Sequence, residues 1–275
     1  MTTDTVRAPA VGLGLPEFYR QREKAILGLA SVVLFMLIWE VAVMNIDPAK
    51  APFFSSPSRI AKAAMVLIES GELWIHLRVS GGEFLLGYLL SVAIGVPVGI
   101  CLGWYQRLNY AFDPFTSALY AAPGVAFLPL IMIWLGIGLA SKIALIVLAA
   151  VFPILINSRD AVKTTPRNLL EAARSFQASQ WQIFCTIVLP SAVPFILTGL
   201  RLGAGRALIG VFVAEMYIAQ AGIGYMITQA GVSFKTDIVF VGVLVFSLTG
   251  MITFELLSQL ERRFDKWRPA IGAGE

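Results

Sequence analysis

The chain is organised as long apolar runs separated by short polar segments. A helix that crosses a bilayer needs about 20 consecutive apolar residues, and six runs fit this requirement. They cover approximately 25–44, 84–104, 115–135, a run after 142 that ends near 156, 191–219 and 238–257. The pattern predicts an all-α, polytopic membrane protein with about six transmembrane helices. The transmembrane domain is expected over 25–260, with polar terminal segments at 1–24 and 261–275.

The segment between the first two spans, residues 47–76, is expected to lie outside the membrane. From Ser58 onward its apolar residues recur with helical spacing, which predicts a surface helix started by Ser58. Trp74 and His76 follow at the expected membrane interface, where amphipathic rings are favoured. We interpret His76 as an interfacial anchor rather than a metal ligand, because the chain contains one histidine.

Glycines at four-residue spacing mark the second span. Gly95, Gly99 and Gly103 share one helical face, and such a face lets another helix approach closely. We therefore predict a packing seam rather than a nucleotide-binding loop. A short turn containing Arg107 and Asp113 is expected after this span.

The third span contains Pro123, Gly124 and Pro129, which are expected to kink or unwind it. Broken helices are tolerated in a membrane where protein or a water-filled cavity covers the freed backbone groups. Residues 122–129 are therefore a candidate wall of a translocation pathway. Plain structural kinking is an equal alternative.

The fifth span carries charged residues, which in a membrane helix usually face protein or water. Arg201 and Arg206 are about 140° apart on a helix with 3.6 residues per turn, so they do not share a narrow face. Both are candidate pathway residues, and bracing of the helix bundle is the favoured alternative to direct contact with an anionic solute. Glu215, near the outer end of the span, is interpreted in the same way.

Composition supports a membrane protein and argues against most enzyme classes. Of 275 residues, 57% are hydrophobic and 14% charged, with a mean hydropathy of +0.78, whereas soluble domains average about 25% charged residues. One histidine and the distant cysteines Cys101 and Cys185 leave no metal site or catalytic triad to propose. The two cysteines are expected to be reduced thiols. The chain also lacks a GxxxxGK[ST] phosphate-binding loop.

The longest polar interruption between strongly apolar runs lies at about 158–190. Good helix formers follow Pro166, so a short surface helix is predicted there, with Thr164 or Thr165 available as its cap. A second apolar run ends at Pro190, which suggests a bend at the entrance to the fifth span.

This interruption resembles the cytoplasmic coupling loop of the permease subunits of bacterial ATP-binding-cassette (ABC) importers. That family's signature is Glu-Ala-Ala, three residues, Gly, nine residues, Ile, one residue and Leu-Pro. The chain matches it at Glu171, Ala172, Ala173, Ile187, Leu189 and Pro190. Gln177 occupies the glycine position. Because glutamine does not adopt positive φ as readily as glycine, a continuous helix or a different bend is expected there.

Basic residues indicate the orientation of the chain. With an inside N-terminus, the outside segments carry six lysines and arginines, against thirteen on the inside; the six are Lys50, Arg59, Lys62, Arg78, Lys142 and Lys235. The positive-inside rule therefore predicts both termini and the Glu171 loop in the cytoplasm.

The resemblance extends from about Ser55 to Arg268 and is to the subfamily that imports nitrate, aliphatic sulfonates and taurine. It is carried by stretches such as SSPSRI, VFPILIN and TGLRLGAGRALIGVFVAEM. It implies a type I ABC importer permease fold in the bacterial inner membrane, and a homodimer with two cytoplasmic ATPases and a periplasmic or lipid-anchored solute-binding protein. ATP and Mg²⁺ would be bound by the ATPases, with no cofactor in this chain. The residues implied to couple to the ATPases are Glu171, Ala172, Ala173, Arg174, Gln177, Ile187, Leu189 and Pro190.

Alternatives remain both for the solute and for the class of membrane protein. The subfamily favours a small anion such as nitrate, a sulfonate or a taurine-like compound, although related permeases also take neutral or heteroaromatic vitamin precursors. An ion-coupled secondary transporter is the main alternative, but it would be expected to show intramembrane carboxylates and often an internal repeat, and neither is clear. A membrane enzyme would need clustered catalytic groups at one membrane face.

Overall fold

The computed structural model describes residues 17–47, 50 and 53–264, and the part of the chain that it describes contains helices and no strands. The helices are α1 (Glu17–Met44), α2 (Pro57–Glu69), α3 (Glu72–Trp104), α4 (Gln106–Ala121), the 3₁₀ helix η2 (Gly124–Phe127), α5 (Leu128–Leu135), α6 (Leu139–Lys163), α7 (Arg167–Ser175), α8 (Gln180–Ile183), the π-helical segment η3 (Phe184–Val188), α9 (Leu189–Ile218), α10 (Ile223–Val232) and α11 (Thr236–Phe264).

Five helices are long and apolar enough to cross a membrane, and the bent pair formed by α4 and residues 124–135 makes a sixth span. The all-α prediction with about six spans is therefore confirmed. The predicted N-terminal segment 1–24 and the C-terminal tail 261–275 lie mostly outside the described residues. Both neighbouring helices extend past the predicted boundaries, since α1 begins at Glu17 and α11 continues to Phe264.

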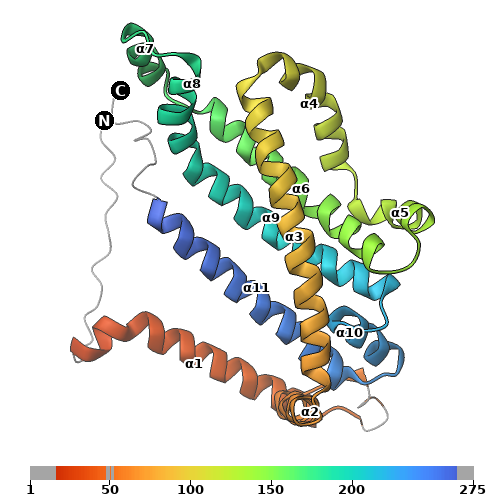
Figure 1. The fold of residues 1–275 in the computed structure, drawn as a ribbon. Helices are drawn as coiled ribbons and strands as arrows, with labels where there is room; N and C mark the ends of the chain where they lie inside the picture. The colour runs from red at the N-terminus through yellow and green to blue at the C-terminus, as the bar shows by residue number, and fades with distance from the viewer. Residues whose placement is uncertain (1–16, 48–49, 51–52, 265–275) are drawn as a thin grey trace, which may run out of the picture.

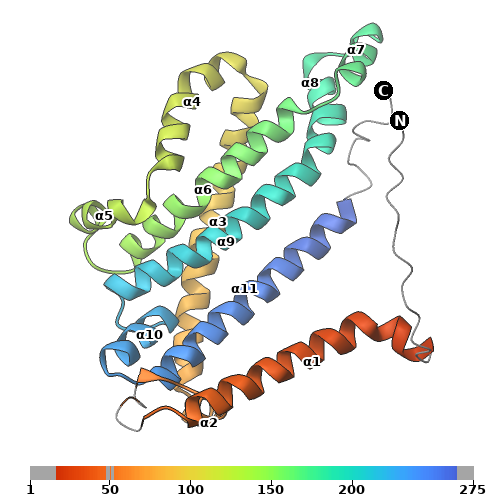
Figure 2. The ribbon, with the colours of Figure 1, turned by 180° about the vertical axis from the view of Figure 1, so that it is seen from behind.

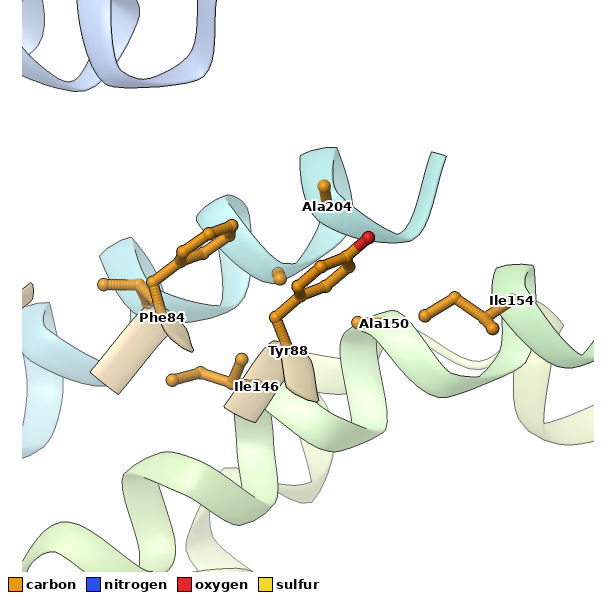
Figure 3. Close-up of a cluster of buried hydrophobic side chains, with 8 residues drawn as sticks. Phe84, Tyr88, Ile146, Ala150, Ile154 and Ala204 are labelled. Atoms are coloured by element: carbon orange, nitrogen blue, oxygen red, sulfur yellow. The ribbon is translucent and has the colours of Figure 1, made fainter. Parts of the chain in front are cut away.

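Helix α6 lies at the centre, between α3 and α9, and packs along both (Figure 1). Their shared core contains Ile146, Ala150 and Ile154 from α6, with Tyr88 from α3 and Ala204 from α9 (Figure 3). Lipid is as apolar as these side chains, so close van der Waals packing must hold the helices together. Helix α11 packs beside α9 and α10, whereas α1 lies apart from the bundle except near α2 (Figures 1 and 2).

The glycines of α3 form the predicted seam, and α6 is the helix that packs on it. A Cβ added at Gly95 would lie 2.9 Å from Ile154 Cγ2, and one added at Gly103 would lie 2.6 Å from the Arg159 carbonyl oxygen. Gly99 lies equally close to the backbone of Leu155. Any side chain here would push α6 away, so the spacing of the glycines sets the distance between the two helices.

The third span is broken, as its prolines predict. Helix α4 and the segment 124–135 meet at 94°, and Pro123 lies at the break, immediately before η2. Pro129 does not interrupt a helix, because it occupies the first turn of α5, where its missing N–H is not needed. The predicted turn with Arg107 and Asp113 is wrong, since both residues lie in α4. Asp113 instead forms an ion pair with Arg159 of α6.

Tertiary contacts change three expectations at the end of the bundle formed by α2 and α10. Helix α2 begins at Pro57 rather than at Ser58, and Glu40 of α1 accepts hydrogen bonds from the Ser58 N–H at 3.0 Å and the Ser58 hydroxyl at 2.6 Å. His76 is buried, 8% exposed, and is therefore not an interfacial anchor. The segment after α9, for which the sequence analysis gave no helix, contains α10.

Candidate functional site

Helix α7 lies at one end of the molecule, opposite the end formed by α2 and α10 (Figures 1 and 2). It lies in the segment predicted to be the coupling loop, and it connects α6 to the helices that lead into α9. Pro166 is the residue before its first turn. The two predicted caps do not act as such, because the Thr164 and Thr165 hydroxyls donate back to carbonyl groups of α6.

The two sides of α7 differ in what they contact. Leu170 and Ala173 pack against a buried cluster that includes Val162, Ile183 and Val188. The other side of the helix is exposed and combines apolar with charged residues; it contains Leu169, Glu171, Ala172 and Phe176, and we call it the outer face of α7. Phe176 is 86% exposed and Leu169 is 44% exposed. The inner face anchors α7 to the bundle, and the outer face is exposed in the part of the chain that the structure describes.

Gln177 adopts the left-handed conformation, with φ of 57°, so the expectation of a continuous helix or a different bend is wrong. Its N–H donates to the Arg174 carbonyl at 2.9 Å, and the Ala178 N–H donates to the Ala173 carbonyl at 3.1 Å. These two bonds form the Schellman motif in which glycine is usual. Glutamine therefore takes the positive-φ position that glycine usually occupies in this motif, at a conformational cost of about 1 kcal/mol.

The second half of the loop leads into α9 as one uninterrupted run of helical segments from Gln180 to Ile218. The Ser179 hydroxyl accepts from the Gln182 N–H at 3.3 Å, and the Gln182 side chain accepts from the Ser179 N–H at 2.8 Å. This reciprocal capping box starts α8. The π-helical turn η3, which contains Ile187, then accommodates the missing N–H of Pro190, and Leu189 begins α9.

A second feature is a cavity of about 240 Å³ inside the bend of the broken third span. Residues of α4, η2, α6 and α9 line it, and these are Leu119, Tyr120, Ala122, Gly124, Val125, Leu145, Leu148, Ala149, Phe152, Arg206, Ile209, Gly210 and Val213. We call it the Arg206 cavity. It brings together two predicted pathway residues, Gly124 and Arg206, that are far apart in the sequence.

The remaining predicted pathway residues lie elsewhere. Pro123 adjoins the cavity in sequence, and Pro129 lines a separate, more open hollow with Tyr217. Arg201 Nη1 is 3.0 Å from Glu261 Oε2 of α11, so this arginine joins α9 to α11. Glu215 is fully buried among protein groups.

Glu215 belongs to a polar cluster that satisfies the first N–H groups of α10. Its two carboxyl oxygens accept from the Ser80 hydroxyl at 2.6 Å and from the Gly224 N–H at 2.7 Å. Ser80 Oγ also accepts from the Ile223 N–H at 2.8 Å, and His76 Nδ1 accepts from the Gly222 N–H at 3.0 Å. Helices α3 and α9 thus supply the cap that α10 itself lacks.

An ion pair between Lys142 of α6 and Glu83 of α3 lies buried beside this cluster. Lys142, which the sequence analysis counts among the outside residues, lies near the start of α6 and is 9% exposed. The only sequence signal for the cluster is the spacing of His76 and Ser80, which places both on one face of α3. Within the described residues, no group of histidines, cysteines and carboxylates is arranged to hold a metal ion.

Residues 95–266 match the family described as "Binding-protein-dependent transport system inner membrane component". The chain is 35% identical over 249 residues to the putative aliphatic sulfonates transport permease protein SsuC of Bacillus subtilis (strain 168), with 90% of each chain covered. It is 33% identical over 241 residues to the taurine transport system permease protein TauC of Escherichia coli (strain K12), with 86% of each covered.

The fold is similar to that of a chain in the inward-facing MetNI methionine ABC transporter. The TM-score is 0.60 at 17% identity, with 70% of this chain and 97% of that chain covered. Membership of the matched family implies an ATPase and a binding protein as partners. The chain therefore belongs to the binding-protein-dependent transport system inner membrane component family, and it is the permease component of an ABC transporter, a multi-pass inner-membrane transport subunit without catalytic activity.

Proposed function

We propose that the chain forms the translocation pathway of an importer for a small organic sulfonate, and that α7 couples it to the ATPase. The outer face of α7 is the observation that carries the proposal. Phe176 is almost fully exposed on this face, which also carries Glu171, whereas Leu170 and Ala173 pack on the bundle. An apolar stripe flanked by charge suits a helix that docks into a groove on a partner.

The connections of α7 suit the transmission of movement. On one side Thr164, Thr165 and Pro166 join it to α6, and on the other side α8, η3 and α9 form one span from Gln180 to Ile218. Because Leu170 and Ala173 pack on the ends of α6 and α9, a displacement of α7 must move both helices. Closure of two ATPases would thus shift the permease between outward-open and inward-open states.

The proposed assembly has two copies of the permease, two cytoplasmic ATPases that bind ATP and Mg²⁺, and one solute-binding protein outside. Both termini and α7 would face the cytoplasm. The excess of inside arginines and lysines supports this orientation. Arg206 is exposed in a single copy, which supports a second wall for the pathway, since an arginine in a membrane helix needs protein or water around it.

The sulfonate assignment rests on the relatives, whose names specify aliphatic sulfonates and taurine. The rival ion-coupled carrier would use intramembrane carboxylates that exchange ions. Glu83 and Glu215 are such carboxylates, but Lys142 pairs with the first, and Ser80 and the Gly224 N–H bind the second. These bonds indicate structural roles and do not favour the carrier.

Purification and transport test the proposal together. The tagged chain should bring down an ATPase from membranes, and the complex reconstituted with its binding protein should take up radiolabelled taurine or ethanesulfonate only when ATP is supplied. Phe176→Ala should weaken ATPase retention, whereas Leu135→Ala, an exposed position at the end of α5, should not. Uptake that survives ATP depletion while an ion gradient is intact, with no ATPase retained, would refute the proposed coupling through α7.

A further inference from the structure

We propose that the Arg206 cavity is the intramembrane binding site for the anionic group of the transported solute, and that Arg206 determines the specificity for anions. The inference rests on the proposed function, because it assumes that the solute is a small organic sulfonate. It adds the location of the solute site within this chain and names the residue that would bind the anionic group.

The first argument is the contrast between the two arginines of α9. Arg201 is paired with Glu261, and Thr198 Oγ1 donates to the other oxygen of the same carboxylate at 2.8 Å. For Arg206 the structure records no hydrogen bond or ion pair with any residue that it describes. A guanidinium stays charged, and it has five N–H donors. An arginine without an internal carboxylate at membrane depth is suited to an anion that comes from outside the chain.

Depth in the membrane supports the same conclusion. Arg206 lies twelve residues before the end of α9, or about 18 Å along the helix at 1.5 Å per residue. The half-thickness of the hydrocarbon core is about 15 Å. Measured along the helix, Arg206 therefore lies about as far from the end of α9 as the middle of the hydrocarbon core lies from its edge. Solute sites in transporters are typically found at this depth and beside broken helices.

The lining of the cavity fits one class of solute. Among the cavity residues that the structure describes, Arg206 is the charged one, and Tyr120 adds a hydroxyl. Most of the others are aliphatic or glycine, which suits a short hydrocarbon body. Pockets for drug-sized ligands measure roughly 300–1,000 Å³, so a cavity of about 240 Å³ fits a smaller molecule. A sulfonate offers two oxygens to the planar fork of a guanidinium.

The bend of the third span is what opens this space. At Pro123 and Gly124 the two parts of the third span meet at 94°, and residues on both sides of this bend line the cavity together with residues of α6 and α9. A Cβ added at Gly124 would meet no atom within 4 Å, so the backbone at this position faces open space. The break therefore exposes backbone to a site rather than to lipid, which is where a broken helix is tolerated.

The test uses the complete transporter in proteoliposomes, with the permease, its ATPase and its binding protein. Uptake is measured for taurine, ethanesulfonate and a neutral aminopyrimidine, together with the ATPase activity stimulated by the loaded binding protein. Arg206→Gln should lower sulfonate uptake at least tenfold and leave stimulated ATPase activity within twofold of wild type. Arg206→Lys should give intermediate uptake, because it keeps the charge and loses the fork. Arg78→Gln, an exposed arginine of α3, is the matched control.

Three results would overturn the inference, and they differ from one another. If Arg206→Gln carries sulfonates as well as wild type, the cavity is not the anion site and the proposed function stands. If wild type carries the aminopyrimidine and no sulfonate, the solute class and the inference are both wrong. If Arg206→Gln loses thermal stability and ATPase stimulation together with uptake, Arg206 is a structural residue.

Discussion

Replacement of Glu215 by alanine should loosen α10 from the bundle. The substitution removes the acceptors of two buried donors, the Ser80 hydroxyl and the Gly224 N–H. A buried donor left without a partner costs about 1–3 kcal/mol, and the space left by the side chain adds to this. We expect the free energy of unfolding to fall by about 3–5 kcal/mol.

Ser80→Ala should cost less, about 1–2 kcal/mol, because the Glu215–Gly224 bond remains and the Ile223 N–H alone loses its acceptor. Ser80 and Glu215 share a hydrogen bond. The loss in free energy of unfolding of the double variant should therefore be about 1 kcal/mol smaller than the sum of the two single losses. This coupling distinguishes a loss of the shared bond from two unrelated defects.

Thermal unfolding of the purified permease in nanodiscs measures these differences, and hydrogen exchange locates them. Exchange should accelerate at the amides of Ile223 and Gly224 in Glu215→Ala. The control is Glu255→Ala, an exposed carboxylate of α11, which should change stability by less than about 0.5 kcal/mol. If Glu215→Ala has the same melting temperature as the control and these amides stay protected, the carboxyl group does not hold α10 and the reasoning is wrong.

Three further substitutions test other parts of the structure. Gln177→Gly should stabilise the α7 turn by about 1 kcal/mol, since glycine adopts positive φ without strain; thermal unfolding that shows no gain would contradict this turn geometry. Gly99→Ala should lower the melting temperature because the added methyl group meets the α6 backbone, whereas Gly82→Ala should not, because a Cβ there would meet no atom within 4 Å. Equal melting temperatures of the two variants would contradict the close packing of α6 on the α3 glycines. Glu171→Lys should uncouple ATP hydrolysis from uptake at unchanged stability, and normal uptake at normal expression would count against its coupling role.

The number of membrane helices, the glycine seam and the short helix after Pro166 could all be predicted from the sequence. Each of these depends on local pattern. Apolar length alone decides whether a run can span a bilayer, and a four-residue glycine repeat such as Gly95, Gly99 and Gly103 creates a flat face on any helix. The prolines at 123 and 129 likewise mark a disturbed span in every context, although not which of them breaks it.

Tertiary structure decided what the polar side chains do. The burial of Lys142 could not be predicted from its neighbours in the chain, because its partner Glu83 is 59 residues away in the sequence. The sequence likewise treats Arg201 and Arg206 alike, and only the positions of α11 and of the broken third span separate them. The conformation of Gln177 also depends on packing, since the buried contacts of Ala173 and Ala178 hold the turn closed against a small intrinsic preference. Hydropathy and spacing are properties of neighbouring residues, whereas a charge or a strained backbone is stabilised by groups that only the fold brings close.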